Sequence, residues 1–175
     1  MRRLLLLRHA KAERLQSGGR DHDRILAKRG REDASAVGAY LVRHRLTPDR
    51  ALVSTAARTR ETWAQVATAL ASPPPAEFEG SIYEASPEAI LQTIKATEPA
   101  ARTLIVVGHN PGMQQLAGML IASGDIEARQ RLLEDFPTAA FAMISFAAES
   151  WDGLHPAGGR LEHFVTPDAL EAATD

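Results

Sequence analysis

Two short, uninterrupted apolar runs constrain the fold of this chain more than any other feature. Leu4 to Leu7 and Leu104 to Val107 contain only leucine, isoleucine and valine. Because no polar residue alternates with the apolar ones, each run is typical of a strand that is buried on both faces of a sheet. Ala51 to Val53 predicts a further short strand of the same kind.

Segments with helical periodicity separate the predicted strands. Apolar residues recur at intervals of three and four around Val37, Trp63 and Ile90. This alternation predicts an α/β fold, namely a three-layer α/β/α sandwich with a mostly parallel central sheet. Two late strands, expected over residues 139–146 and 160–165, are close enough in sequence to form a hairpin. We therefore expect one late antiparallel strand in the sheet.

Capping residues indicate where two of the helices begin. Ser86 followed by Pro87 is typical of the first residues of a helix, and Asp125 can cap another. Between these two starts, an apolar stripe predicts a helix that extends through Ile121.

Composition excludes several classes of protein. The chain has 175 residues, which suits one domain, and its 22 acidic and 20 basic residues give a formal charge of −2. A nucleic-acid-binding protein would usually carry a strongly basic face, so we expect no nucleic-acid partner. The chain has no cysteine, which excludes disulfides, thiolate zinc sites and a cysteine nucleophile.

No apolar run approaches the roughly 20 residues that a membrane-spanning helix needs. The N-terminal run of leucines ends at Arg8, too early for the apolar region of a secretory signal. We therefore expect a cytoplasmic protein without a membrane partner, and we favour a monomer. Residues 1–167 are expected to form the domain, and residues 168–175 a C-terminal tail that is either a short helix or frayed.

Polar side chains follow three of the predicted strands directly. Arg8 and His9 come after the first strand, Arg58 lies one helical turn beyond the second, and His109 and Asn110 follow the third. In open α/β sheets ligands bind beyond the carboxyl ends of the strands, so we expect two arginines and two histidines to meet at one edge of the sheet. A charged side chain next to a buried strand costs free energy unless it is paired, which indicates a shared anionic ligand.

These residue types are suited to phosphate chemistry. Two guanidinium groups can bind phosphate oxygens in a planar, bidentate manner. One neutral imidazole can attack phosphorus near pH 7, and the other can donate a hydrogen bond to the phosphoryl group in the transition state. A helix that begins near Pro111 would direct its free backbone N–H groups at the same place. Because the arginines supply positive charge, no metal ion or other cofactor is expected.

The strand-end motifs resemble those of a known family. Leu6-Leu7-Arg8-His9-Ala10 is similar to the Arg-His signature of the histidine phosphatase superfamily, in its phosphoglycerate mutase-like branch. The segment 54–62 resembles the Ser-x-x-x-Arg-x-x-x-Thr element of that superfamily, and Val107-Gly108-His109-Asn110-Pro111 resembles its second histidine motif. Further matches, to the small SixA-like phosphohistidine phosphatases, lie at residues 23–26, 28–30, 82–87 and 136–140.

The resemblance implies a phosphoglycerate mutase-like fold and a phosphatase that forms a covalent phosphohistidine. His9 would be the nucleophile, and the phosphate pocket would be completed by Arg8, Arg58 and His109, with Asn110 as a further substrate-binding residue. Glu84 lies in the stretch where larger members carry a proton donor to the leaving group. The insertions that those members use to select substrates are not evident, so we expect an open, shallow pocket. Residues 1–167 would be a single histidine phosphatase domain.

Several functions are consistent with these residues. The first is a metal-independent hydrolase of phosphohistidine on a signalling or phosphotransfer protein, and the second is a small-molecule phosphomonoesterase of the same superfamily. A non-catalytic phosphate-binding module is disfavoured by the complete set of histidines and arginines. A mutase is the least favoured function, because it would need a pocket closed against water. The expected partner is therefore a phosphorylated protein or a small phosphorylated metabolite.

One other motif is consistent with a different chemistry. Asp21-His22-Asp23 resembles a metal-binding cluster, or the Asp-x-Asp nucleophile motif of a different phosphatase class. That nucleophile motif requires a buried strand immediately before it, whereas the preceding residues 17–20 are typical of a loop. We therefore expect the triplet to lie in a loop near the mouth of the pocket. The remaining histidines, His44, His155 and His163, are expected to be structural or solvated.

Overall fold

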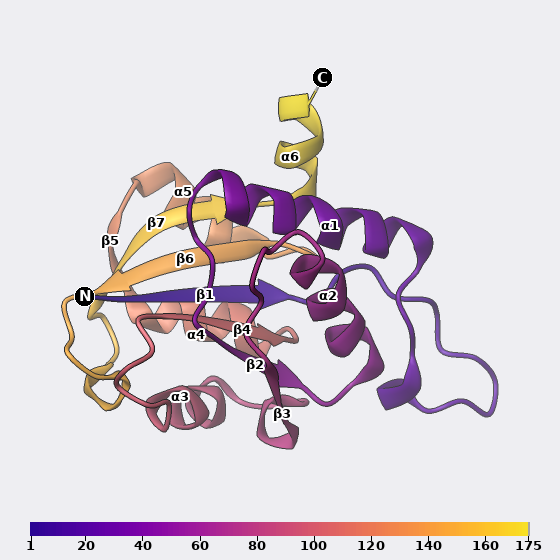
Figure 1. Ribbon diagram of the computed structural model, residues 1–175, viewed down its shortest axis with the longest axis horizontal. Coiled ribbons are helices and arrows are strands. Elements are labelled where there is room, and N and C mark those ends of the chain that lie inside the picture. The colour runs from indigo at the N-terminus through magenta and orange to yellow at the C-terminus, as the bar shows by residue number, and fades with distance from the viewer. Residues whose placement is uncertain (175) are drawn as a thin grey trace.

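A seven-stranded sheet forms the centre of the structure, a computed structural model that describes residues 1–174 (Figure 1). The strands are β1 (Arg2–Arg8), β2 (Arg50–Ser54), β3 (Ala76–Glu79), β4 (Thr103–Gly108), β5 (Ile121–Gly124), β6 (Phe141–Phe146) and β7 (Gly159–Val165). Their order across the sheet is β3-β2-β4-β1-β6-β7-β5. β6 runs antiparallel to both of its neighbours, and the other neighbouring strands pair in parallel. The expected mostly parallel sheet with a late antiparallel strand is confirmed.

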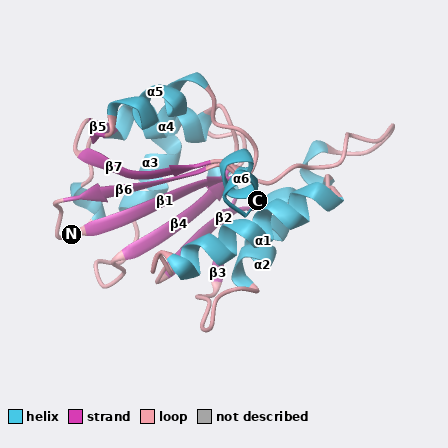
Figure 2. Ribbon diagram, turned by 90° about the horizontal axis from the view of Figure 1, so that it is seen from above, coloured by secondary structure: helices cyan, strands magenta, loops and turns pink. Residues whose placement is uncertain are grey.

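Helices cover both faces of the sheet (Figure 2). They are α1 (Lys28–Arg43), α2 (Ala57–Ala67), α3 (Pro87–Lys95), α4 (Gly112–Leu120), α5 (Ile126–Glu134) and α6 (Pro167–Thr174). Single turns of 3-10 helix occur at η1 (Asp21–Asp23), η2 (Gly80–Ile82) and η3 (Trp151–Gly153). α1 and α2 lie on one face of the sheet, and α3, α4 and α5 lie on the other. This is the predicted three-layer α/β/α arrangement.

The first strand shows why the sheet has two hydrophobic cores. Side chains of a strand alternate in direction, so Leu4 and Leu6 face α3, α4 and α5, whereas Leu5 and Leu7 face α1 and α2. All four leucines are fully buried. Burial on both faces is the reason why this run contains no polar residue. It also places β1 in the middle of the sheet, with its carboxyl end at the site described below.

The C-terminal end of α4 differs from the sequence prediction. The helix ends at Leu120, and Ile121–Gly124 form the edge strand β5, which is parallel to β7. The prediction of a helix through Ile121 was therefore wrong. Pairing with β7 satisfies the backbone groups of this segment as well as another helical turn would, and a β-branched isoleucine favours the strand.

Other element boundaries follow local chemistry. Ser86 and Asp125 cap α3 and α5 as predicted, because each side chain accepts a hydrogen bond from the backbone N–H three residues on, at 3.2 and 2.8 Å. The late strand expected from residue 139 begins instead at Phe141. Ala139 has a left-handed backbone with a φ of 61°, so the chain turns there before the strand starts.

The segment between β1 and α1 projects from the carboxyl ends of the strands as an arm (residues 11–27; Figures 1 and 2). Backbone hydrogen bonds tie its two sides together, from Glu13 N–H to Ile25 at 2.8 Å and from Ala27 N–H to Lys11 at 2.9 Å. The returning side of the arm carries η1, which contacts α2.

The C-terminal residues form α6, which packs against α1. Leu170 is buried there, and Arg29 forms an ion pair with Glu171 at 2.7 Å. Asp175, the last residue of the expected tail, lies outside the described residues. Among the helices of residues 1–174, none combines the length and the apolar character that crossing a membrane requires.

Candidate active site

Parallel pairing of β1 with β4 brings the two predicted histidines together. Arg8 is level with Gly108 in the register of these strands, so His9 and His109 leave the sheet side by side. The backbone N–H of His9 donates to the carbonyl oxygen of Gly108 at 3.0 Å. The centroids of the two imidazole rings are 5.3 Å apart. The predicted meeting of strand ends therefore occurs at this edge of the sheet.

The backbone holds His9 in one tautomer. The residue is only 8% exposed, and its Nδ1 lies 2.8 Å from the carbonyl oxygen of Ala10. Because a carbonyl oxygen only accepts, Nδ1 carries the proton and Nε2 keeps its lone pair. Burial, together with the nearby positive charges of Arg58 and Arg8, lowers the pKa of His9 to about 4. The ring is therefore neutral at pH 7 and has a nucleophilic nitrogen.

His109 is also buried, and it is held by the last residue of β2. Its Nε2 lies 2.7 Å from the hydroxyl oxygen of Ser54. Burial lowers the pKa of His109 to about 3, and the positive charge of Arg58 adds to the effect. Two neutral imidazoles thus lie close to positively charged guanidinium groups, an environment that favours an anion.

The two predicted arginines reach the site from different elements. Arg8 ends β1, and its Nη1 donates to the carbonyl oxygen of Phe136 at 3.1 Å. Arg58 lies in the first turn of α2 and is only 6% exposed. Its Nη1 donates to the backbone carbonyl of Asp21 at 2.9 Å, and its Nη2 donates to the carboxylate of the same residue at 3.1 Å.

Several nitrogen atoms of this cluster are buried without a hydrogen-bond partner. Within the described part of the chain five buried side-chain atoms lack a partner, and three of these are Arg8 Nε, Arg58 Nε and His109 Nδ1. A buried polar atom without a partner costs roughly 1–3 kcal/mol, and native proteins contain few of them. Three such atoms from three strand ends mark a site whose ligand would supply the missing partners.

An acidic residue that strand-end reasoning did not place in the site is part of it. Asp21 belongs to η1, and its carboxylate accepts hydrogen bonds from Arg58, from Arg24 at 3.0 Å and from the hydroxyl of Tyr83 at 2.5 Å. The hydrogen bond from Tyr83, followed by those from the arginines, holds the pKa of Asp21 well below its usual range. Asp21 follows no strand and Tyr83 is separated from β3 by η2, so the acidic triplet at 21–23 was the signal available in the sequence.

The expected loop at 21–23 forms a single 3-10 turn beside the site. His22 joins this turn to the start of α2, because its Nε2 lies 2.8 Å from the hydroxyl oxygen of Thr55. Among the side chains of the described residues, no group of three or more His, Cys, Asp or Glu is arranged to hold a metal ion. In the structure the triplet contacts arginines and a tyrosine.

A cavity of about 610 Å³ lies beside Arg58 and His109, whereas Arg8 and His9 are not among the residues that line it. Its polar lining consists of Asp21, Arg58, Glu84, Ser86, His109, Asn110 and Gln115. The amide of Asn110 also donates to the carbonyl oxygen of Phe136 at 2.9 Å, so the same carbonyl orients both Asn110 and Arg8. The volume lies within the range of typical small-molecule sites, about 300–1,000 Å³.

Glu84 lies at the rim of this cavity in an uncommon backbone conformation. It is exposed and has a φ of 51°, a value that costs energy for a residue other than glycine. The loop that carries it packs against α4 at Gly112. A Cβ atom on Gly112 would lie 2.3 Å from the carbonyl oxygen of Ala85, so only glycine permits this close approach. The packing of α4 therefore holds the loop with Glu84 beside the cavity.

Comparison of this chain with other sequences identifies a family that is consistent with this arrangement of side chains. Residues 4–86 match the model of the histidine phosphatase superfamily, branch 1. The chain is 34% identical over 163 residues to Rv1276c of Mycobacterium tuberculosis, a protein described as uncharacterized, and the match covers 92% of this chain and 99% of that protein. It is 32% identical over 181 residues to the chloroplastic protein At3g52155 of Arabidopsis thaliana, covering 96% and 79% of the two chains. The chain belongs to the histidine phosphatase superfamily.

Solved structures show which group within that superfamily this chain resembles. The candidate phosphohistidine phosphatase SixA of Nakamurella multipartitia is 32% identical with a TM-score of 0.82, over 95% of this chain and 96% of that chain. The corresponding candidate from Agrobacterium tumefaciens is 31% identical with a TM-score of 0.79, over 95% and 99%. The protein histidine phosphatase SixA in complex with tungstate shares the fold, with a TM-score of 0.77 at 20% identity over 96% and 99% of the two chains. Within the superfamily, this chain is similar to the SixA group.

Proposed function

We propose that this protein is a phosphatase that forms a covalent phosphohistidine at His9. The observation that carries the proposal is the set of three buried, unpartnered nitrogen atoms on Arg8, Arg58 and His109, next to a neutral His9 whose Nε2 is free. A phosphoryl group brings three strong acceptor oxygens, so one ligand can serve several of these atoms at once. Membership of the superfamily supports a phosphatase activity.

The reaction proceeds in two steps. First, Nε2 of His9 attacks phosphorus in line with the leaving group. The new N–P bond forms while the bond to the leaving oxygen or nitrogen breaks, and the leaving group takes that electron pair and a proton. Second, a water molecule attacks the phosphohistidine. The P–N bond breaks, Nε2 regains its lone pair, and the water gives up a proton as inorganic phosphate forms.

Arg8, Arg58 and His109 hold the phosphoryl oxygens through both steps, and Asn110 is a further binding group. The arginines are permanently charged, and their burial strengthens their interaction with an anion relative to bulk water. Most of the rate acceleration then comes from positioning and electrostatic stabilisation, as expected for phosphoryl transfer. The scheme needs no metal ion, because the arginines neutralise the charge that develops.

We favour phosphohistidine on a protein as the substrate. The structures at 31% and 32% identity are named as SixA phosphohistidine phosphatase candidates, which supports this choice. A histidine nitrogen is a better leaving group than an alkoxide, so the reaction depends less on a strong proton donor. A small-molecule phosphomonoester is the second candidate, because the cavity of about 610 Å³ has room for a larger leaving group. For such a substrate, Glu84 at the rim is the proposed proton donor.

A substrate panel separates these functions. Phosphate release is measured from a phosphohistidine protein, from sugar phosphates and from a chromogenic aryl phosphate, each with and without EDTA. We expect the highest kcat/KM on the phosphohistidine protein and no effect of EDTA. A higher kcat/KM on a sugar phosphate would establish the second candidate instead. No release from any substrate would contradict the phosphatase proposal, and strong inhibition by EDTA would contradict a metal-free mechanism.

A further inference from the structure

The carboxylate of Asp21 holds one of the arginines proposed to bind phosphate, and the two-step scheme gives it no role. Arg58 donates from Nη2 to this carboxylate at 3.1 Å and from Nη1 to the backbone carbonyl of Asp21 at 2.9 Å. One residue therefore engages both terminal nitrogens of the guanidinium group. Nε of Arg58 is buried without a hydrogen-bond partner, so the contact with Asp21 satisfies the two terminal nitrogens and leaves the third nitrogen of the guanidinium unsatisfied.

Two further donors converge on the same carboxylate. Arg24 donates at 3.0 Å and the Tyr83 hydroxyl at 2.5 Å, which joins the arm, α2 and the segment before α3 in one network. Tyr83 also packs edge-on against His109, with 5.3 Å between ring centroids. Asp21 lines the same cavity as Arg58 and His109, so its charge acts on any anion bound there. The low pKa of Asp21 keeps this carboxylate ionised across the working range of pH.

We propose that Asp21 is a positioning residue and the built-in counterion of the phosphate pocket: it aligns Arg58 and limits the affinity of the pocket for phosphate. The inference rests on the proposed function, because it requires Arg58 to bind phosphate. A carboxylate beside the guanidinium offsets part of its attraction for a second anion, and the two negative groups repel each other. A pocket with unopposed arginines would retain product phosphate, whereas a pocket with Asp21 releases it more readily.

The first experiment compares Asp21→Asn with the wild-type protein. The amide keeps the size of the side chain and one acceptor oxygen but removes the charge. We expect inorganic phosphate, measured by calorimetry and as a competitive inhibitor of aryl phosphate hydrolysis, to bind about tenfold more tightly to the variant. A merely structural role would weaken phosphate binding or leave it unchanged.

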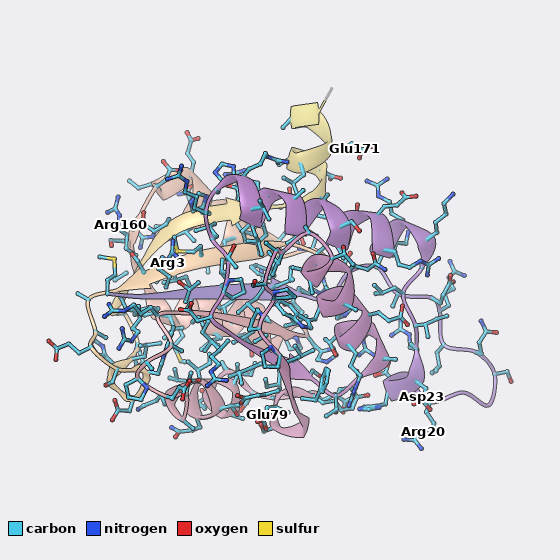
Figure 3. The ribbon with its side chains drawn as sticks, viewed as in Figure 1. Arg3, Arg20, Asp23, Glu79, Arg160 and Glu171 are labelled. Atoms are coloured by element: carbon cyan, nitrogen blue, oxygen red, sulfur yellow. The ribbon has the colours of Figure 1, made fainter. Side chains whose placement is uncertain are left out.

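Asp23→Asn is the matched control. It changes the net charge by the same amount two residues away, but Asp23 is paired with Arg20 at 3.6 Å, and both side chains are largely exposed. Figure 3 shows these two residues at the outer edge of the molecule. We expect the phosphate affinity of Asp23→Asn to stay within about twofold of wild type, because solvent screens the charge.

Two more variants distinguish the effect of the charge of Asp21 on phosphate affinity from the effect of its side-chain shape. Asp21→Glu keeps the charge and should bind phosphate nearly as weakly as wild type. Tyr83→Phe removes a donor and leaves Asp21 less neutralised, so phosphate should bind about twofold to threefold more weakly. Equal tightening in Asp21→Glu and Asp21→Asn would overturn the proposal, as would unchanged or weaker binding by Asp21→Asn.

If Asp21→Asn does not fold, Tyr83→Phe decides the question, because tighter or unchanged phosphate binding in that variant overturns the proposal. A wild-type protein that binds no phosphate is a distinct result, since it contradicts the proposed function itself.

Discussion

Single hydrogen bonds hold the rings of the two candidate-site histidines in place. The carbonyl oxygen of Ala10 binds Nδ1 of His9, and the hydroxyl of Ser54 lies against Nε2 of His109. Each contact orients one ring and determines which of its nitrogens is available to a ligand. The chemistry of the site therefore depends on Ala10 and Ser54, two residues that do not themselves react.

Ser54→Ala tests this dependence at His109. We expect kcat/KM for an aryl phosphate to fall about tenfold, because the buried Nε2 loses its partner and the ring loses its orientation. The control is Thr59→Val, since the Thr59 hydroxyl donates to the backbone carbonyls of Ser54 at 2.8 Å and Ala56 at 2.9 Å. This control should stay within about threefold of wild type in steady-state kinetics. An unchanged kcat/KM in Ser54→Ala would show that His109 needs no such support.

Burial of the two neutral histidines also predicts how stability depends on pH. Their folded pKa values, about 4 for His9 and about 3 for His109, lie below the value of about 6.5 in an unfolded chain. The unfolded state therefore binds more protons at acidic pH, and the free energy of unfolding should fall as the pH drops from about 6.5 toward 4. Asp21 acts in the same direction once the pH falls below about 5, where an unfolded aspartate begins to protonate, and its contribution grows toward lower pH.

Urea unfolding at pH 7.5, 6.5, 5.5 and 4.5 measures this dependence. His163, whose pKa burial also lowers, contributes in the same direction. The double variant His9→Asn, His109→Asn is the comparison that isolates the two site histidines, and its stability should fall less between pH 6.5 and 4.5. Equal slopes in the two proteins would contradict the assignment of neutral, buried histidines.

The sequence predicts the candidate site residues that lie at or just beyond strand ends, namely Arg8, His9, Arg58, His109 and Asn110. It does not identify the role of Asp21 or Tyr83, since these residues are separated by long stretches of chain and meet only when the arm folds back onto α2. The tautomers of the histidines are likewise absent from any motif. They depend on which acceptor or hydroxyl lies within hydrogen-bond distance in the folded chain.

Among the elements, α4 and the loop before α3 position the rim of the cavity. Gly112 lies at the start of α4, where its missing side chain lets the backbone of Ala85 approach. The same loop carries Glu84 in its left-handed conformation. The position of the rim therefore depends on one contact between α4 and the loop.

Gly112→Ala tests that contact. The added Cβ would lie 2.3 Å from the carbonyl oxygen of Ala85, so backbone must move, and we expect a loss of roughly 1–3 kcal/mol in the free energy of unfolding. Gly118→Ala in the same helix is the control, because its Cβ meets only the flexible tip of the exposed Leu133 at 3.0 Å. That variant should be neutral or stabilised by up to about 1 kcal/mol, as alanine favours helix. Urea unfolding of both variants measures these changes. Equal free energies of unfolding for Gly112→Ala and Gly118→Ala would contradict the packing argument.

For secondary-structure elements, the sequence predicts the presence of strands more reliably than the ends of helices. β1 and β4 are evident from their apolar runs, because burial on both faces admits no polar residue. β5 is not evident, because Ile121 continues the apolar stripe of α4 and only the presence of β7 beside it makes a strand favourable. The pattern of neighbouring residues contains no information about a pairing strand that is distant in the sequence.

At the scale of the whole molecule, the order of the strands in the sheet brings the residues of the candidate site together. β1 lies between β4 and β6, so the carboxyl ends of β1 and β4 are adjacent although about 100 residues separate them in the chain. Their side-by-side ends place His9 and His109 together, and β2 on the other side of β4 adds Ser54 and the start of α2 with Arg58. The site is thus a consequence of strand order, which the α/β pattern and the parallel pairing made predictable.

The central claim is that a phosphoryl group is transferred from the substrate to Nε2 of His9 and from there to water. The most direct test is to mix the protein with a phosphorylated substrate, quench in base, and locate the acid-labile phosphate by mass spectrometry and ³¹P NMR. We expect phosphate on Nε2 of His9 and neither phosphoenzyme nor turnover in His9→Ala, whereas His163→Ala should retain both. Phosphate on another residue, or normal turnover by His9→Ala, would contradict the account.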